Sequence, residues 1–256
     1  RAVVDDASNA QQIAEAAVDA GTEVGLLVEV DIGNHRCGVP PGPPTLSVIR
    51  ALMGMDGIRF DGLHAYHGHV VGIVDASERE LAARETMLQA IQTRRLIESE
   101  EIDCHILSGA GGSTYRTVGQ LEGVDELQIG TYVTMDWSYK QRASEFDIAL
   151  TVLATVISAH EDYFVLDVGV KGVAHEYGPP HVFGHPEFEI PRFGAEEHAI
   201  VRARHHGMSI GDRLHVSPSH ACATCNLYRQ MVVREGDVVK EVWPISARGY
   251  GLDALE

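Results

Sequence analysis

The sequence VGLLVEVDIGNHRCG occupies residues 24–38. Its first half is an almost continuous apolar run, as expected of a strand buried on both faces of a parallel sheet. Its second half, from Asp31 to Gly38, is polar and bounded by glycines. Parallel α/β folds carry their ligand sites at the carboxyl ends of the strands. The stretch therefore indicates an α/β fold with a binding site just after this strand.

Helical and strand-like segments alternate on both sides of this stretch. A helix is expected over residues 9–20, with Ser8 as its N-cap and Gly21 at its end. Repeating β-α-β units with short loops predict a parallel sheet, open or closed into a barrel, over residues 1–145. The other expected helices cover residues 45–53 and 77–98, and the other expected strands cover residues 58–66, 104–107 and 126–129.

The predicted first domain is short for a complete barrel. A barrel of eight βα units takes about 250 residues, whereas residues 1–145 show only four or five strands. The chain is already strand-like at Arg1-Ala2-Val3-Val4. We therefore expect the chain to begin inside a barrel, with an N-terminal segment of roughly 100 residues before it.

Residues 146–256 have a different character, because helical patterns nearly vanish. Glu235-Gly236-Asp237 is typical of a hairpin turn. This part of the chain is expected to form an all-β domain, with the boundary near residues 144–147. Its expected strands cover residues 148–158, 163–168, 213–217, 229–233 and 238–243.

The composition excludes some classes of partner. Of the 256 residues, 45% are hydrophobic, so a sizeable core can be buried. The net charge of −17 argues against nucleic acid and anionic membrane surfaces as partners. No apolar run approaches the length of a transmembrane helix. A reduced, cytoplasmic setting fits the four cysteines, Cys37, Cys104, Cys222 and Cys225.

A glycine-rich segment, SGAGGSTY, occupies residues 108–115 after an expected strand. Without Cβ atoms its backbone can approach an anion, and its N–H groups can converge on a phosphate. Ser113 and Thr114 would add hydroxyl donors, and a helix start would add a favourable dipole. Gly130-Thr131-Tyr132 is a candidate for a second contact with the same phosphate. A plain loop is the alternative, since no Lys follows the glycines as in a Walker sequence.

Three histidines and an arginine lie near strand ends. His64, His67 and His69 suggest either metal ligands or, as we prefer, an imidazole lying against an aromatic cofactor. Arg36 is placed to pair with an anionic oxygen, and a solvated loop arginine is the alternative.

The segment VSPSHACATCNLY, residues 216–228, contains the pair His220-x-Cys222. On an extended segment the two side chains would point the same way. Imidazole and thiolate suit Zn²⁺, and two protein ligands leave open positions for catalysis. One alternative is a reduced Cys in a core strand beside a surface His. The other is a redox pair Cys222-x-x-Cys225, which we disfavour because such a pair opens a helix after a strand.

Together these segments resemble the pyridoxal phosphate (PLP) enzymes of the alanine racemase fold. Residues 28–33, with Arg36-Cys37-Gly38, are similar to the barrel signature of that fold. Further motifs narrow the resemblance to the group of D-serine dehydratase, D-threonine aldolase and 3-hydroxyaspartate lyase. These motifs are Tyr66-His67-Gly68, Gly109-Ala110-Gly111, Gln128-x-Gly130-x-Tyr132, Met135-Asp136 and Pro218-Ser219-His220-x-Cys222. The resemblance runs from about Val3 to Gly249.

The resemblance implies a PLP-binding barrel, a C-terminal β domain and a homodimer with shared active sites. It places Arg36, Tyr66 and His67 around the pyridoxal ring. His220 and Cys222 would hold a divalent metal beside the substrate, and the thiolate favours zinc over Mg²⁺ or Mn²⁺. The phosphate would be held by Gly111, Gly112, Ser113, Thr114 and Tyr132, with Gln128 and Gly130 in the same cofactor site.

One family residue has no counterpart in the chain. The family forms its Schiff base with PLP through a Lys on the first barrel strand. The chain contains Lys140, Lys171 and Lys240, and none of them matches that motif. The absent Lys and the short barrel are both explained by the expected N-terminal segment.

The resemblance implies a lyase acting on a small D-3-hydroxy amino acid. Cys at the second metal position favours β-elimination of water to an oxo acid and ammonia, as in D-serine or D-3-hydroxyaspartate dehydratase. The alternative is retro-aldol cleavage to glycine and an aldehyde, towards which Asn226-Leu227-Tyr228 points. An amino-acid racemase and a non-catalytic, PLP-free protein are the remaining alternatives.

Overall fold

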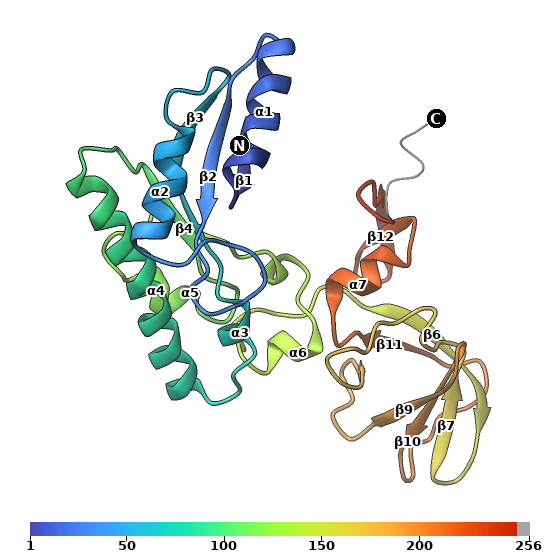
Figure 1. Ribbon diagram of the computed structural model, residues 1–256. Helices are drawn as coiled ribbons and strands as arrows, with labels where there is room; N and C mark the ends of the chain where they lie inside the picture. The colour runs from blue at the N-terminus through green and yellow to red at the C-terminus, as the bar shows by residue number, and fades with distance from the viewer. Residues whose placement is uncertain (250–256) are drawn as a thin grey trace. The chain divides into compact units, whose positions relative to one another are not determined.

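The computed structural model describes residues 1–249 (Figure 1). Contacts within the chain divide it into two units, Arg1–Gly130 and Thr131–Glu256. Residues 131–145, which the sequence analysis assigned to the first domain, are grouped with the second unit. No helix among the described residues is long and apolar enough to cross a membrane.

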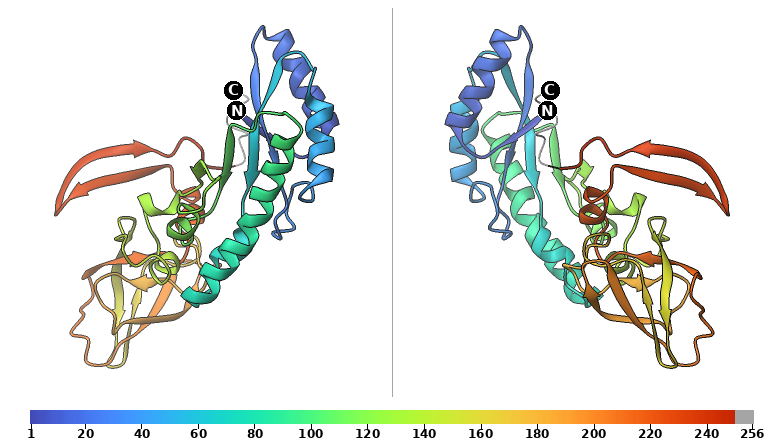
Figure 2. Two further views of the ribbon diagram at one scale, coloured as in Figure 1. Left: turned by 90° about the vertical axis from the view of Figure 1, so that its left-hand side faces the viewer. Right: turned by 90° about the vertical axis from the view of Figure 1, so that its right-hand side faces the viewer.

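The first unit is an α/β layer built on a parallel sheet with strand order β1-β2-β3-β4-β5. Figure 2 shows helices α1, α2 and α4 along one face of this sheet, and they contact β2, β3 and β4. The expected βα alternation is therefore confirmed. The strands are β1 (Ala2–Val4), β2 (Val24–Glu29), β3 (Ile58–Ala65), β4 (Ile106–Gly109) and β5 (Glu126–Leu127). The helices are α1 (Ala7–Asp19), α2 (Pro43–Leu52), α3 (Gly68–Val71), α4 (Ala76–Ser99) and α5 (Tyr115–Val118).

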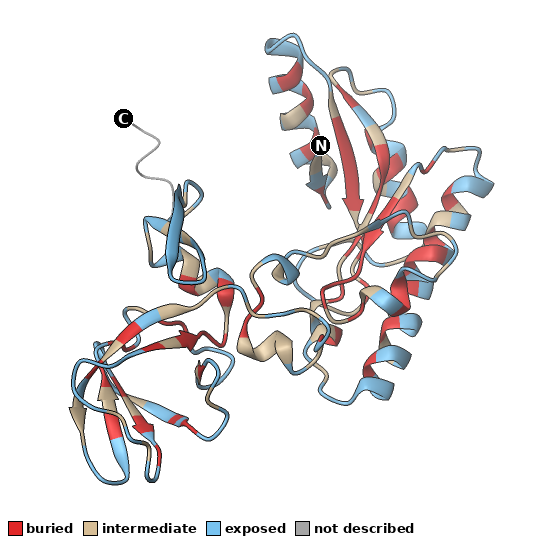
Figure 3. Ribbon diagram, turned by 180° about the vertical axis from the view of Figure 1, so that it is seen from behind, coloured by how far each residue is buried: buried red, intermediate tan, exposed pale blue. Residues whose placement is uncertain are grey.

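Strand β2 lies in the interior of this sheet, between β1 and β3. Leu26 and Val28 are completely buried, and Leu27 is 7% exposed. Figure 3 shows most of the ribbon of the central strands in the colour of buried residues. Burial on both faces explains why this strand has no alternation of polar and apolar residues. The main core of the unit forms between these strands and the apolar faces of the helices, including Ile49, Leu63 and Met87.

The N-cap expected at Ser8 was wrong by two residues. Helix α1 begins at Ala7, and its N-cap is Asp6. One carboxylate oxygen of Asp6 accepts the backbone N–H groups of Ser8 and Asn9 at 2.8 and 3.2 Å. An aspartate satisfies the free N–H groups at a helix start as well as a serine does, so residue type alone does not decide between Asp6 and Ser8.

The second unit contains a closed barrel with strand order β10-β7-β6-β11-β8-β9 and a separate hairpin, β12–β13. The all-β character expected for this part of the chain is confirmed. Its strands are β6 (Val152–Ala159), β7 (Tyr163–Leu166), β8 (His181–Val182), β9 (Glu189–Ala195), β10 (His198–Arg202), β11 (Arg213–Ser217), β12 (Gln230–Glu235) and β13 (Val238–Pro244). The short helical segments are η1 (Thr131–Val133), α6 (Trp137–Lys140) and α7 (Ala221–Asn226).

The barrel core comes from alternate residues of its strands, including Val156, Phe164, Leu166, Val201 and Val216, each of which is completely buried. Outside the barrel, β12 and β13 pair in antiparallel register around Gly236, whose φ is +57°. The hairpin turn predicted at residues 235–237 is confirmed.

The extended conformation expected through Cys222 is wrong. Strand β11 ends at Ser217, and helix α7 begins at Ala221. His220 is still extended, with φ −142° and ψ 116°, and serves as the N-cap. Cys222 lies in the first turn of the helix, so the two residues do not share a strand face. The two-residue side-chain period of a strand does not apply to them.

Candidate functional site

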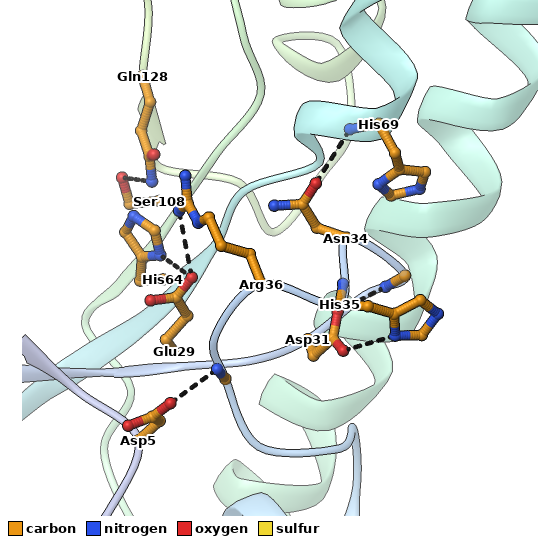
Figure 4. Close-up of polar contacts among 12 residues, drawn as sticks. Asp5, Glu29, Asp31, Asn34, His35, Arg36, His64, His69, Ser108 and Gln128 are labelled. Atoms are coloured by element: carbon orange, nitrogen blue, oxygen red, sulfur yellow. Dashed lines mark hydrogen bonds and ion pairs between the residues drawn. The ribbon is translucent and has the colours of Figure 1, made fainter.

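A polar cluster lies at the carboxyl ends of β2, β3 and β4 in the first unit (Figure 4). At its centre is the Glu29 carboxylate, whose Oε1 lies 3.5 Å from Nη2 of Arg36 and 3.8 Å from Nδ1 of His64. The second distance is too long for a hydrogen bond. Within residues 1–249, Nδ1 of His64 is buried without a hydrogen-bond partner. Such an atom calls for an explanation, and a bound polar ligand is one.

Gln128 joins the same cluster from the segment after β5. Its Nε2 donates to Oγ of Ser108 at 3.0 Å, and Ser108 donates to the Glu126 carboxylate at 2.6 Å. Burial lowers the pKa of His64, while Glu29 and a hydrogen bond with Gln128 act in the opposite direction. The predicted residues Arg36 and Gln128 thus converge on one histidine.

Arg36 also meets Tyr66, because its guanidinium lies 5.3 Å from the centre of the tyrosine ring. The loop that carries Arg36 is held by Asp31, whose Oδ1 accepts the backbone N–H groups of Gly33 and His35, each at 3.0 Å. Although burial opposes the effect, these bonds hold the pKa of Asp31 below its usual range. A loop fixed in this way presents Arg36 in a defined position.

His67 is completely buried, and both of its ring nitrogens have protein partners. Nδ1 lies 3.1 Å from Oγ1 of Thr86 on α4, and Nε2 lies 2.8 Å from Oγ1 of Thr114. Burial lowers the pKa of His67 to about 4, so the ring is neutral near pH 7. The imidazole therefore ties the glycine-rich segment to α4.

The glycine-rich segment at residues 109–114 is also held from behind by a buried arginine. Nε of Arg79 donates to the carbonyl of Ser113 at 3.2 Å, and Oγ of Ser113 donates to the carbonyl of Val71 at 3.0 Å. Gly111 and Gly112 are buried, and a Cβ on Gly111 would lie 2.5 Å from Cγ1 of Val71. Any larger residue at this position requires Val71 to shift.

The hydroxyls of Ser113 and Thr114, which were expected to contact a phosphate, both bond within the protein. Oγ1 of Thr114 accepts the N–H of Gly111 at 3.0 Å. In the described part of the chain, the N–H groups of Gly112 and Ser113 have no acceptor. Two free backbone donors ahead of the short helix α5 fit a phosphate. The side-chain hydroxyls shape the loop that presents these donors.

Gly130 and Tyr132 lie where the two units of the chain join. Gly130 is the last residue of the first unit. Tyr132 lies in η1 of the second unit, and its ring packs against Phe146 with centroids 5.7 Å apart. Their part in phosphate binding stays a prediction.

The metal-ligand candidates lie in the second unit, at the start of α7. His220 pairs through Nδ1 with the Glu176 carboxylate. Because Nδ1 is engaged, Nε2 is the nitrogen left for a ligand. A carboxylate on the second nitrogen is the usual arrangement of a metal-binding histidine. Cys222 is exposed, so an imidazole nitrogen and a thiol are both available, and this donor set fits a divalent ion.

Among residues 1–249, no group of three or more His, Cys, Asp or Glu side chains could hold a metal ion. A metal at α7 would therefore have two protein ligands and open positions for other ligands. His64, His67 and His69, which we considered as metal ligands, do not form such a group.

Several residues of these sites were not identified from the sequence. Most of them form no motif, because their partners are distant in the chain: Glu176 is 44 residues from His220, and Arg79 is 34 residues from Ser113. The usable signals were the position of Glu29 in the quoted strand and that of Ser108 at the start of the quoted glycine-rich segment. The missed residues are Glu29, Arg79, Thr86, Ser108 and Glu176.

Two family models match the chain, one in each part of it. A family model for the alanine racemase N-terminal domain matches residues 1–137. A model described as "Putative serine dehydratase domain" matches residues 149–234. The D-threonine aldolase of Arthrobacter sp is 36% identical over 255 residues, which cover 96% of this chain and 67% of the relative. The chain belongs to the family of D-threonine aldolase, which combines an alanine racemase N-terminal domain with a serine dehydratase domain. The resemblance inferred from its motifs and the predicted fold class are confirmed.

Two other curated relatives differ in their reactions. The 3-hydroxy-D-aspartate aldolase of Paracoccus denitrificans (strain Pd 1222) is 29% identical, over 97% of this chain and 66% of the relative. The D-threo-3-hydroxyaspartate dehydratase of Delftia sp. (strain HT23) is 26% identical, over 87% of this chain and 65% of the relative. The family thus contains aldolases and a dehydratase. The chain spans about two thirds of the length of these relatives.

Two solved structures share the fold. The D-threonine aldolase of Filomicrobium marinum superposes with a TM-score of 0.90 at 30% identity, covering 96% of this chain and 69% of that chain. A variant of D-threo-3-hydroxyaspartate dehydratase in a metal-free form superposes with a TM-score of 0.80 at 24% identity, covering 97% of this chain and 72% of that chain. The family uses PLP and a metal.

Proposed function

We propose that this chain is part of a PLP- and metal-dependent lyase that cleaves a small D-3-hydroxy amino acid to glycine and an aldehyde. The observation that carries the proposal is the similarity to D-threonine aldolase, which extends over 96% of the chain. Cys222 led us to expect elimination of water, and the similarity to two aldolases supports the alternative, retro-aldol cleavage. The aldolases of the family match the chain at higher identity than the dehydratase does.

The first unit would bind the cofactor. Its support is the pair of free N–H groups at Gly112 and Ser113, which suit a phosphate, and the polar cluster of Glu29, Arg36 and His64. The unpartnered Nδ1 of His64 suits a polar group of the cofactor or substrate. In this proposal the Arg36 guanidinium, held beside Tyr66, orients an anionic oxygen.

The second unit would bind the metal through His220 and Cys222. The Glu176 carboxylate holds Nδ1 of His220 and leaves Nε2 free to bind the ion. When bound, PLP takes up electrons from Cα of the amino acid, and the ion polarises the 3-hydroxyl group as a Lewis acid. Zinc is our preferred metal because Cys222 offers a thiolate, and thiolates bind Zn²⁺ better than they bind Mg²⁺ or Mn²⁺.

A dehydratase is the second candidate, and Cys222 favours it. The resemblance inferred from the motifs implies that Cys at the second ligand position points to a dehydratase. Elimination would give an oxo acid and ammonia from D-serine or D-3-hydroxyaspartate. The residues that hold the cofactor and the metal would be the same in both reactions, so only the products separate them.

The test supplies PLP, zinc and one substrate at a time to the full-length protein. The substrates are D-threonine, D-serine and D-threo-3-hydroxyaspartate, and the products are glycine with an aldehyde, or ammonia with an oxo acid. Glycine as the main product supports the aldolase. Ammonia and an oxo acid without glycine would replace it by the dehydratase. Formation of the L-enantiomer without cleavage would indicate a racemase instead.

We also propose a homodimer in a cytoplasmic setting. The apolar exposed surface of the hairpin β12–β13, which includes Val232, Val239 and Trp243, supports association with a second copy. The four free cysteines support a reducing compartment. The mass of the full-length protein from sedimentation equilibrium tests the dimer, and a monomer at micromolar concentration would contradict it.

A further inference from the structure

Asp136 is a completely buried carboxylate whose two oxygens bind two different helix starts. It is the N-cap of α6, where Oδ1 accepts the N–H of Tyr139 at 2.8 Å. Oδ2 accepts the N–H of Ala221 at 3.0 Å, across 85 residues of sequence. A buried charge is costly unless it is hydrogen-bonded. These two backbone donors hold the carboxylate at the point where α6 and α7 begin.

The bond to Ala221 replaces a cap that His220 does not provide. The first N–H groups of a helix have no partner within the helix. His220 is the N-cap of α7, yet its side chain makes no capping hydrogen bond. Its imidazole pairs with Glu176 instead. Asp136 therefore satisfies the first N–H of α7, which leaves the histidine ring available as a ligand.

Other bonds hold the backbone on both sides of His220. The N–H of Trp137, next to Asp136, donates to the carbonyl of Pro218 at 2.9 Å. Oγ1 of Thr224 donates to the carbonyl of His220 at 2.9 Å. The segment that carries both metal-ligand candidates is thus anchored before and after the histidine. Within residues 1–249, Asp136 is the only carboxylate that accepts a backbone N–H group of residues 218–224.

We propose that Asp136 is a positioning residue for the metal site: through the N–H of Ala221 it fixes where α7 begins and so sets the spacing between His220 and Cys222. This inference rests on the proposed function, in which those two residues bind a divalent ion. Asp136 does not itself contact the ion. It affects how well His220, which precedes the helix, and Cys222, in its first turn, are aligned to bind one ion.

The test measures Co²⁺ and Zn²⁺ affinity of the full-length protein and its Asp136→Asn variant. Asparagine has the same shape but only one acceptor oxygen, so it cannot accept the N–H groups of Tyr139 and Ala221 together. Co²⁺ binding is followed by the thiolate-to-cobalt charge-transfer band, and Zn²⁺ by competition with a chelator. The matched control is Asp75→Asn, at the N-cap of α4, where Asp75 accepts the N–H of Glu78 at 2.8 Å.

Asp136→Asn is expected to weaken metal binding about 10-fold or more, as for other residues that orient metal ligands. PLP affinity should be unchanged in both variants, and Asp75→Asn should bind metal like the wild type. Equal metal affinity in Asp136→Asn and wild type would overturn the inference and leave the metal site standing. A wild-type protein that binds no Co²⁺ would overturn the metal site itself.

A second variant guards against misfolding of the first. Asp136→Ser keeps a good N-cap for α6 but is too short to reach Ala221 as well. It should show the same loss of metal affinity with native circular dichroism. If it folds and binds metal like the wild type, Asp136 has only a structural role in α6.

Discussion

Nε2 of His67 lies 2.8 Å from Oγ1 of Thr114, and both side chains are buried in the first unit. This bond, with that from Nδ1 to Thr86, connects the glycine-rich segment to α4. The partners of the imidazole are two threonine hydroxyls, and no carboxylate among residues 1–249 pairs with it, so the neutral form is favoured. The consequence is a stability that depends on pH.

Protonation of His67 should destabilise the folded protein in acid. Its pKa is about 4 in the folded state, against 6.5 for an ordinary histidine. The unfolded chain therefore takes up the proton first as the pH falls, and the free energy of unfolding drops between pH 6.5 and 4. With these two pKa values, the free energy of unfolding falls by about 3 kcal/mol by pH 4. Above pH 6.5 this group contributes no pH dependence.

The measurement compares urea unfolding of the wild type and His67→Gln from pH 7.5 to 4. Glutamine does not titrate, so the difference between the two free energies isolates the histidine. The free energy of unfolding of the wild type, relative to that of His67→Gln, should fall by about 3 kcal/mol between pH 7.5 and pH 4. A difference that stays constant across the range would show that His67 is not buried in its neutral form.

Gly111→Ala should damage the glycine-rich segment. The new Cβ would lie 2.5 Å from Cγ1 of Val71, and overpacking of this kind costs about 1–3 kcal/mol. Affinity for PLP, followed by absorbance, should fall together with the melting temperature. The matched control is Gly72→Ala, because a Cβ at Gly72 meets nothing within 4 Å. Equal PLP affinity in both variants would place the phosphate elsewhere.

Zinc should protect Cys222, but not Cys37, from alkylation. Both cysteines are exposed, and only Cys222 is proposed as a ligand. Cys104 is a buried reference whose pKa burial raises to about 12, so it should react only on unfolding. Mass spectrometry after iodoacetamide treatment, with and without zinc, measures each rate. Protection of neither exposed cysteine, or of both equally, would count against Cys222 as a ligand.

Glu176→Gln should weaken metal binding about 10- to 100-fold, because the amide no longer supplies the charge that orients and polarises His220. A second carboxylate–histidine pair provides the control: Glu187 lies 3.1 Å from Nδ1 of His185. Glu187→Gln should leave metal affinity unchanged. Calorimetric titration with zinc compares the variants, and an unchanged affinity in Glu176→Gln would remove this carboxylate from the site.

The sequence was most informative where one segment alone determines the structure. The buried run at β2, the long helix α4 and the hairpin turn at Gly236 depend on local residue types, and each lies where it was expected. The family resemblance followed from the order of short motifs, and the comparison with known proteins confirmed it. Gln128 and Arg36 were predicted in this way and lie in the polar cluster, and their part in cofactor binding stays a prediction.

Features that depend on distant partners were missed. The segment from His220 to Cys222 was expected to be extended, but helix α7 begins at Ala221. The first N–H of this helix is bound by Asp136, 85 residues away, and a window around His220 contains no such signal. Strands β8 to β10 were not recognised either. β9 contains Pro191 and Gly194, both unusual in strands, and β8 has only two residues.

The most direct test of the account is the Cys222→Ala variant of the full-length protein, assayed with D-threonine, PLP and zinc. We predict that PLP absorbance is retained while bound zinc and glycine formation are both lost, because the Cys222 thiolate binds the metal and does not contact PLP. Wild-type rates of glycine formation in this variant would contradict the account.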